Sequence, residues 1–451
     1  MKNFLIVFQA ILIFLFYSVI SAQDAGKYYK VEYQPSTVSG ELQVGVTYAI
    51  WIPDTTKTLR GIIVHQHGAG TSAARASEFA AYDLHWQALA KKWDCALLGP
   101  SYHVSNEKID TSKGSAELWF DPRRGSEKTF LKALDDLAVK STHLEIKTIP
   151  WCLWGHSAGG IWSDVMAALH PERIIAIWLR SGSAEIVKDK PEFKPVQVPN
   201  SLYKIPIMIN TGLKEKGDIN YNVAWEATLR TFNNYRSHGT PIGFAQDPRT
   251  AHETGDSRYL AIPFLDACLA LRLPGKNAKD QSLKPIDISK GWLADLLGNT
   301  AEPASSFKGN INESVWLPDK HVAKAWEEYV KTGEVSDNTP PAAPFDLKVE
   351  NKGEQGIEIS WKADTDFESG IGGFIILRDG IGIARLPQNP PRRVYGRPLF
   401  QYLSYHDTPD GPQPGMRYLD VNVKPGEKYK YSIITINSAG VPSTPSKEVS
   451  N

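Results

Sequence analysis

The sequence predicts an α/β protein, with a mostly parallel sheet flanked by helices and a C-terminal all-β sandwich. Three observations lead to this fold class. Short apolar runs of strand length alternate with longer amphipathic stretches from residue 28 to residue 275. A proline-rich stretch at 337–344 has the composition of a linker, and the residues after it form short alternating runs separated by turn residues. The chain has 451 residues, more than one ordinary domain needs.

The first residues have the pattern of a secretory signal peptide. Lys2 gives a positive start, residues 4–20 form an apolar run, and small residues end it near Ala22. An uncleaved membrane anchor is the alternative, because the run is nearly long enough to span a bilayer. We expect residues 1–22 to be removed, which gives an exported protein, periplasmic or secreted, with no stable membrane insertion afterwards.

The charge balance argues against nucleic acid as a binding partner, and the cysteine count argues against a disulfide-stabilised fold. Lys plus Arg and Asp plus Glu number 50 each, so no basic surface for nucleic acid is expected. The three cysteines cannot build a disulfide framework, and two of them lie in apolar runs typical of buried free thiols. Composition does not determine the oligomeric state.

Residues 23–275 are expected to form the α/β unit. Strands at 29–33 and 42–53 come first, because these stretches alternate or are rich in Val, Tyr, Ile and Trp. Continuously apolar runs of the buried parallel kind follow at 59–64, 95–100, 149–154, 173–179, 205–210 and 241–245. Helices are expected at about 73–93, 126–138, 158–169, 220–238 and 260–273.

The remaining residues divide into two parts. Residues 276–339 are expected to be an irregular extension and linker with one helix at 321–331. Residues 340–451 contain alternating runs at 347–349, 357–361, 374–378 and 429–436, as in an all-β sandwich.

The residues Gly155-His156-Ser157-Ala158-Gly159 lie between an apolar strand and a helix-compatible segment. In this context G-x-S-x-G marks a nucleophile elbow, a turn so tight that the flanking positions must lack side chains. The strain exposes the Ser157 hydroxyl at the N-terminus of a helix, whose dipole favours developing negative charge. An ordinary glycine-rich turn is the alternative interpretation.

A serine nucleophile also needs a base and an acid. In the chain order nucleophile, acid, histidine, the base follows the last strand, and His252 has that position. The acid is expected on the loop after the strand at 205–210, where Glu215 and Asp218 both qualify. Glu215 is favoured because it lies three residues beyond the glycine that ends the strand. A solvated loop residue is the alternative for each.

Backbone amides are expected to stabilise the oxyanion. Gly68 and Ala69 follow an earlier strand, and their small size lets the backbone approach substrate. Ala158, directly after the serine, supplies the other N–H.

On these motifs, residues 28–275 resemble the α/β-hydrolase superfamily. The layout is similar to secreted feruloyl and acetyl-xylan esterases, polyhydroxyalkanoate depolymerases and prolyl-oligopeptidase-like hydrolases. The resemblance implies an eight-stranded sheet and an acyl-enzyme, with no metal or organic cofactor. The acid loop departs from the commonest Gly-x-x-Asp form, which leaves the choice between Glu215 and Asp218 open.

Residues 340–451 resemble a fibronectin type III module, on the proline-rich start, a core Trp361 and the stretch Pro425-Gly426-Glu427-Lys428-Tyr429. The resemblance implies that Tyr429 is the corner tyrosine. The stretch 386–418 is long for such a module and contains Arg392, Arg393, Arg397, Tyr402, Tyr405 and His406. It is either a disordered or self-packed loop, or it folds over the hydrolase and helps to shape the substrate cleft.

The long connection after residue 99 contains aromatic and basic residues, on the side of the sheet where such folds bind ligands. The candidates for substrate binding are Tyr102, His103, Trp119, Arg123 and Arg124. Aromatic side chains stack on sugar rings and arginines pair with carboxylate or sulfate. The favoured alternative is that Trp119 and Phe120 pack the loop down.

His65 and His67 have spacing that suggests a metal site, but no third ligand is near in sequence, so no metal is expected. The sequence therefore predicts an exported serine hydrolase that cleaves carboxylic esters, with a small-molecule or glycan ester as substrate. Ester decorations of polysaccharides fit an exported enzyme with an accessory sandwich. A peptidase of the same fold and a non-catalytic binding or adhesion protein are the alternatives.

Overall fold

The computed structural model describes residues 26–103, 118–188, 195–389, 396–409 and 411–451. The expected signal peptide, most of the long connection after residue 103, and Arg392 and Arg393 lie outside the described residues. Among the helices that are described, none is long and apolar enough to cross a membrane.

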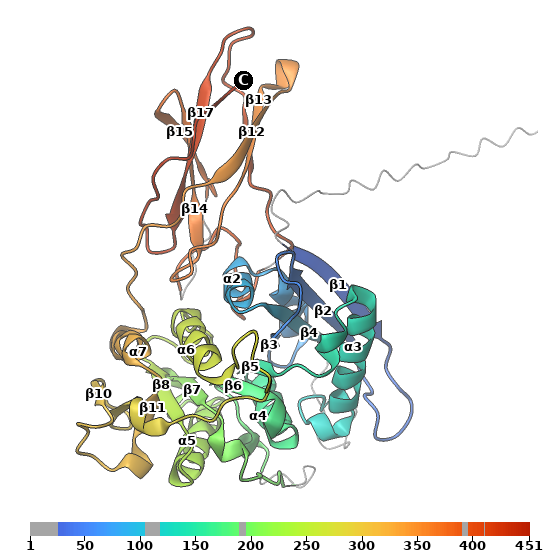
Figure 1. Ribbon diagram of the computed structural model, residues 1–451, viewed down its shortest axis with the longest axis vertical. Coiled ribbons are helices and arrows are strands. Elements are labelled where there is room, and N and C mark those ends of the chain that lie inside the picture. Colours follow the sequence, from blue (N-terminus) through green and yellow to red (C-terminus); the bar gives the residue numbers. More distant parts are fainter. Residues whose placement is uncertain (1–25, 104–117, 189–194, 390–395, 410) are drawn as a thin grey trace, which may run out of the picture.

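An eight-stranded, mostly parallel sheet forms the centre of the α/β unit (Figure 1). Its order is β1-β2-β4-β3-β5-β6-β7-β8; the pairs β1–β2 and β2–β4 are antiparallel, and every later pair in this order is parallel. The strands are β1 (Gly26–Tyr33), β2 (Gly45–Pro53), β3 (Gly61–Gln66), β4 (Cys95–His103), β5 (Trp151–His156), β6 (Ile174–Arg180), β7 (Ile207–Gly212) and β8 (Ile242–Asp247). This confirms the predicted fold class, and β3, β5, β6 and β7 are buried along their whole length, as their continuous apolar runs require.

Helices cover both faces of the sheet. The helices are α1 (Thr71–Glu78), α2 (Leu84–Lys92), α3 (Ser126–Ser141), α4 (Ala158–Leu169), α5 (Asn222–Ser237) and α6 (Arg258–Arg272). On one face Trp86 of α2 contacts Trp154, and on the other Phe130 of α3 contacts Trp151. Successive side chains of β5 point to opposite faces of the sheet, so this strand packs against the helices on both faces.

The single helix predicted at 73–93 is wrong. A short 3-10 turn at Ala80–Tyr82 divides it into α1 and α2. The cause is Asp83, whose side chain accepts hydrogen bonds from the backbone N–H groups of His85 and Trp86 and so starts a new helix.

The segment at 276–339 is more regular than predicted and belongs to the α/β unit. It forms a small antiparallel sheet of β9 (Trp292–Ala294), β10 (Ala301–Pro303) and β11 (Val315–Leu317), followed by α7 (Lys320–Thr332). Trp326 of α7 donates from its indole nitrogen to the carbonyl of Phe244 at 2.7 Å. Trp316, Trp326 and Tyr329 are fully buried in the same core as the large sheet.

The C-terminal residues form a β-sandwich of two antiparallel sheets, with orders β12-β13-β16 and β15-β14-β17-β18. Its strands are β12 (Phe345–Asn351), β13 (Ile357–Lys362), β14 (Ile371–Arg378), β15 (Ile381–Leu386), β16 (Arg417–Asp420), β17 (Lys430–Asn437) and β18 (Val449–Ser450). Trp361 is buried between the sheets against Phe374. The hydroxyl of Tyr429 accepts a hydrogen bond from the backbone N–H of Lys424 at 3.1 Å.

The sandwich stands on the α/β unit beside α2 and α6 (Figure 1). Its connection between β15 and β16 extends onto the α/β unit, and Asp407 on that connection pairs with Arg258 at 3.0 Å. Arg258 also pairs with Asp83 at 2.7 Å, and all three side chains are at most 1% exposed. The side-chain oxygen of Gln401 accepts a hydrogen bond from the backbone N–H of Leu84. Polar groups buried between the two parts therefore fix their arrangement.

Candidate active site

The candidate nucleophile, Ser157, lies between β5 and α4 in a strained backbone conformation. Its φ of 55° and ψ of −120° are rare for a residue with a side chain. A Cβ at Gly155 would lie 2.3 Å from the carbonyl oxygen of Gly159, and one at Gly159 would lie 2.3 Å from that of Gln66. Only glycine fits either position, so the predicted physical reason for the motif holds. The turn places Ser157 at the carboxyl end of the sheet, directly before α4.

The expected oxyanion loop lies against the elbow. A Cβ at Gly68 would be 3.0 Å from the Cβ of Ser157 and 3.5 Å from its Oγ. Ala69 is half-buried on the same loop, and Ala158 is the first residue of α4. The backbone of this loop and the N-terminus of α4 are therefore close to the serine hydroxyl, as an oxyanion hole requires.

His252 and Glu215 are in direct contact. The Nδ1 atom of His252 lies 2.6 Å from Oε1 of Glu215, which is completely buried. The second oxygen of Glu215 accepts a hydrogen bond from Thr211 Oγ1. Asp218 lies further along the loop and accepts two backbone N–H groups just before α5. Of the two acids that the sequence left open, the structure brings Glu215 to the histidine.

Ser157 and His252 share no hydrogen bond among the contacts of the described chain. With Nδ1 of His252 at Glu215, Nε2 is the nitrogen left for the serine hydroxyl. Catalytic hydrogen bonds of this kind often shorten only when substrate binds. The two residues follow β5 and β8, whose carboxyl ends meet at the same edge of the sheet.

One buried arginine connects the elbow to the histidine loop. The backbone carbonyl of Arg180, at the end of β6, accepts the N–H of Ser157 at 2.8 Å. Its guanidinium donates to Thr250 Oγ1 at 3.0 Å and to the backbone carbonyls of Ala251, at 3.1 Å, and Glu253. His252 lies within this segment, so Arg180 sets the position of the loop relative to the serine.

Two tyrosines flank the histidine. Tyr221 stacks on the ring of His252, with centroids 4.3 Å apart. Tyr405, from the C-terminal sandwich, is 54% exposed, and its backbone carbonyl accepts from Thr254 Oγ1 at 3.1 Å. Burial, together with the nearby charge of Glu253, raises the pKa of Tyr405 to about 12. An exposed aromatic side chain of the sandwich thus lies beside the histidine loop.

The expectation that Tyr102 and Trp119 bind substrate is wrong. Their rings stack 4.1 Å apart, and the side chains are only 2% and 1% exposed. The Tyr102 hydroxyl lies 3.3 Å from that of Tyr48 in the core. Trp119 and Phe120 are buried and in contact with each other, as the alternative expected of these two side chains. An apolar run alone does not show which aromatic side chains remain exposed.

The polar candidates on the same connection are engaged within the protein. His103 is exposed, and its Nε2 lies 3.0 Å from Thr47 Oγ1. Arg123 makes two hydrogen bonds to the buried carboxylate of Asp121, and Arg124 lies 3.9 Å from it. The charge of Arg123 is therefore already balanced by an internal partner.

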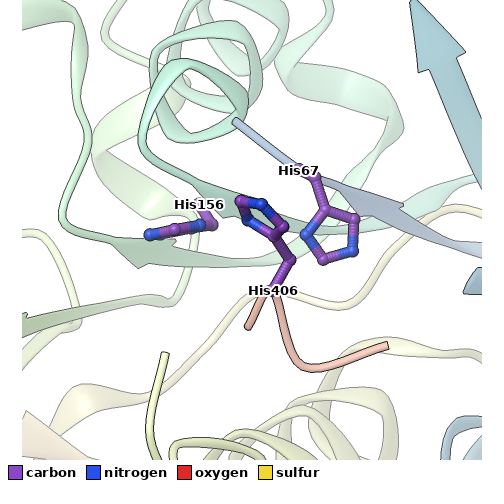
Figure 2. Close-up of side chains that lie close together, drawn as sticks. All are labelled: His67, His156 and His406. Carbon is purple, nitrogen blue, oxygen red and sulfur yellow. The ribbon is translucent and has the colours of Figure 1, made fainter. Parts of the chain in front are cut away.

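A cluster of three buried histidines lies at the same edge of the sheet. His67 follows β3, His156 ends β5, and His406 comes from the long connection of the sandwich (Figure 2). Nε2 of His156 lies 2.8 Å from the backbone carbonyl of His252. Burial lowers the pKa values of His67 and His156 well below the ordinary value and that of His406 to about 4.

Sequence reasoning missed several residues of the site. Arg180 and Tyr221 gave no signal because each contacts a partner distant in sequence. Thr211 gave none because its contact with Glu215, four residues later, depends on how the acid loop folds. Each does lie at a strand end or in the loop that follows, so a search of the carboxyl ends of parallel strands would have found them. Tyr405 and His406 had been noted on the long stretch, but their partners depend on how the two parts dock.

No protein-family model and no curated protein matches this chain. Among solved structures, an S-formylglutathione hydrolase from Agrobacterium tumefaciens is 16% identical, with a TM-score of 0.35 over 55% of this chain and 94% of that chain. A ferulic acid esterase is 13% identical, with a TM-score of 0.38 over 54% and 98%. An Fn3-like protein from Clostridium thermocellum is 18% identical, with a TM-score of 0.16 over 25% and 92%.

The strand order and the strained serine turn of this chain give the same fold class as the sequence predicted. The α/β unit has an α/β-hydrolase fold, followed by a β-sandwich.

Proposed function

We propose that the protein is a serine hydrolase that cleaves carboxylic esters through an acyl-enzyme. The observation that carries the proposal is the meeting of a strained elbow serine with a His252–Glu215 pair at one edge of the sheet. A structural role gives no reason for a buried carboxylate to face a histidine loop that is fixed to the same turn as the serine.

In the proposed reaction, Ser157 Oγ attacks the ester carbonyl while Nε2 of His252 takes its proton. Glu215 accepts the Nδ1 proton of His252, which keeps the ring in the tautomer and orientation that the transfer needs. The backbone N–H groups near Ala69 and Ala158 stabilise the oxyanion. His252 then protonates the leaving alcohol, and water releases the acyl group by the same path in reverse.

We infer further that the protein is exported and acts on ester groups of a larger substrate such as a polysaccharide. The N-terminal signal pattern supports export. The C-terminal sandwich, proposed to be a fibronectin type III module, supports an extended substrate because its long connection reaches the histidine loop. Its Tyr405 lies beside the histidine loop, where an aromatic side chain can contact a leaving group.

The test is active-site labelling with a fluorophosphonate probe, combined with turnover of a short-chain p-nitrophenyl ester. The purified parent and Ser157→Ala are compared, with Ser163→Ala, a buried serine of α4, as the matched control. We expect labelling and turnover in the parent and the control and neither in Ser157→Ala.

A panel of glycan esters and proline-containing peptides then separates the substrate classes. If only the peptides were hydrolysed, the proposed function would be that of a peptidase instead of an esterase. Absence of labelling in the parent protein would overturn the proposal of a serine hydrolase and would favour a non-catalytic binding protein.

A further inference from the structure

Beyond the serine chemistry, we propose that His67, His156 and His406 form a site for a zinc-like transition-metal ion that joins the sandwich to the α/β unit. One ring nitrogen of each histidine lies within 4.8 Å of those of the other two, and all three residues are buried. None of its ligands is assigned a role in the proposed esterase reaction, although His67 and His156 lie directly before Gly68 and Ser157.

The sheet register places the first two ligands. β3 and β5 are parallel neighbours, with Gln66 paired to Gly155. His67 and His156 are the next residues of these two segments, so their side chains start side by side. His406 then approaches from the sandwich and lies between them (Figure 2).

The second observation is that the imidazoles of His67 and His156 are buried with ring nitrogens that have no hydrogen-bond partner among the described residues. Neither ring nitrogen of His67 has a hydrogen-bond partner among the described residues, although the side chain is 0% exposed. In His156 the nitrogen Nε2 faces a carbonyl oxygen, which only accepts, so Nε2 holds the proton. Nδ1 of His156 is therefore a lone-pair donor, and it too lacks a partner in the described chain.

The chemistry of the donors selects the ion. Three imidazoles in a buried place suit zinc and similar transition metals, whereas magnesium and calcium require oxygen ligands. A tetrahedral zinc with nitrogens at about 2.1 Å needs them about 3.4 Å apart. The nitrogens must therefore approach one another by at most about 1.4 Å, which rotation of the side chains and a small shift of the His406 loop can supply.

The experiment is a titration of untagged, chelator-treated protein with Co²⁺, followed by its visible absorption, and then displacement of Co²⁺ by Zn²⁺. We expect one Co²⁺ per chain and an absorption typical of four-coordinate cobalt. His406→Ala should weaken binding by roughly 100-fold, because a ligand is lost. His321→Ala, which removes an exposed histidine of α7, should bind as the parent does. Zn²⁺ should raise the melting temperature of the parent and of His321→Ala only.

X-ray absorption of the zinc-loaded parent provides a measurement that needs no variant. It should show three imidazole ligands at about 2.0 Å. No binding by the parent, equal binding by parent and His406→Ala, or an ion surrounded only by oxygen would each overturn the proposal. Circular dichroism of the metal-free variants shows that a loss of binding is not a loss of fold. All these readouts are independent of whether Ser157 reacts with an ester.

Discussion

At the scale of single residues, the site depends on where a carboxylate is buried. Glu215 is completely buried and has two partners, Thr211 and His252. Asp218, three residues later, is half-buried and binds only local backbone. Because a hydrogen bond to a charged group is stronger away from water, only Glu215 can orient the histidine effectively.

Replacement of the two acids should therefore have unequal effects. Glu215→Gln is expected to lower kcat by about 10³- to 10⁴-fold, since it favours the wrong histidine tautomer. Asp218→Asn should leave kcat within about twofold, because it changes only a local turn. Steady-state kinetics with a p-nitrophenyl ester check this. Equal losses in both variants would contradict the assignment of Glu215.

A second carboxyl makes stability depend on pH. Asp164 of α4 is fully buried and accepts from the backbone of Ala184 and from Tyr235, each at 2.8 Å. Burial raises the pKa of this carboxyl from 3.8 to about 6. The native state therefore binds the proton more tightly than the unfolded state. The contribution of this group to the free energy of unfolding is complete below about pH 4, falls as pH rises to about 6, and is constant above.

The free energy of unfolding is expected to fall by on the order of 3 kcal/mol between about pH 4 and pH 6, because the pKa of Asp164 is raised by about two units. Asp164→Asn should lack this part of the fall, because the amide stays neutral and can still bond to both partners. Urea unfolding of parent and variant over this pH range measures the difference. Parallel curves for the two proteins would show that Asp164 does not titrate there.

At the scale of elements, the reacting groups lie at the ends of different strands and must be held in register. β5 leads into the serine, β7 into the acid loop and β8 into the histidine loop. Arg180 at the end of β6 contacts two of these segments, the elbow through its backbone and the histidine loop through its guanidinium. It is a positioning residue, since it touches no reacting atom.

Arg180→Met should lower kcat by roughly 100-fold with little change in KM, because a displacement of about 1 Å in the histidine costs that much. Arg180→Lys should recover part of the loss, since an ammonium group still donates to the loop carbonyls. The reaction rate with the fluorophosphonate probe should fall in the same order. A purely structural role would instead lower the melting temperature and leave the rate of the folded fraction unchanged.

At the scale of the whole molecule, the sandwich is docked on the α/β unit next to the proposed active site. The buried group of Asp83, Arg258 and Asp407 joins the two parts, and loss of one partner of such a group is strongly destabilising. The same connection carries Tyr405 to the histidine loop. The two parts are therefore expected to act as one enzyme.

Tyr405→Ala should raise KM for an aryl ester about 3- to 10-fold with kcat nearly unchanged, because it removes one aromatic contact to substrate. Tyr402→Ala is the matched control, since Tyr402 is 41% exposed on the same connection. Equal KM values for Tyr405→Ala and the parent would show that the sandwich does not line the cleft.

The sequence by itself determined the parallel sheet, the serine elbow and the histidine that follows the last strand. These features are local, since they depend on apolar runs, on glycine where a Cβ cannot fit, and on chain order. It also identified the sandwich from its alternating runs.

Only the tertiary structure decided between Glu215 and Asp218, buried Tyr102 and Trp119 in the core, and brought Arg180 to the histidine loop. The same is true of the histidine cluster, where His406 meets two residues from the other end of the chain. The physical reason is that burial and long-range pairing depend on how strands and the two parts of the molecule pack. The spacing of residues along the chain does not contain that information.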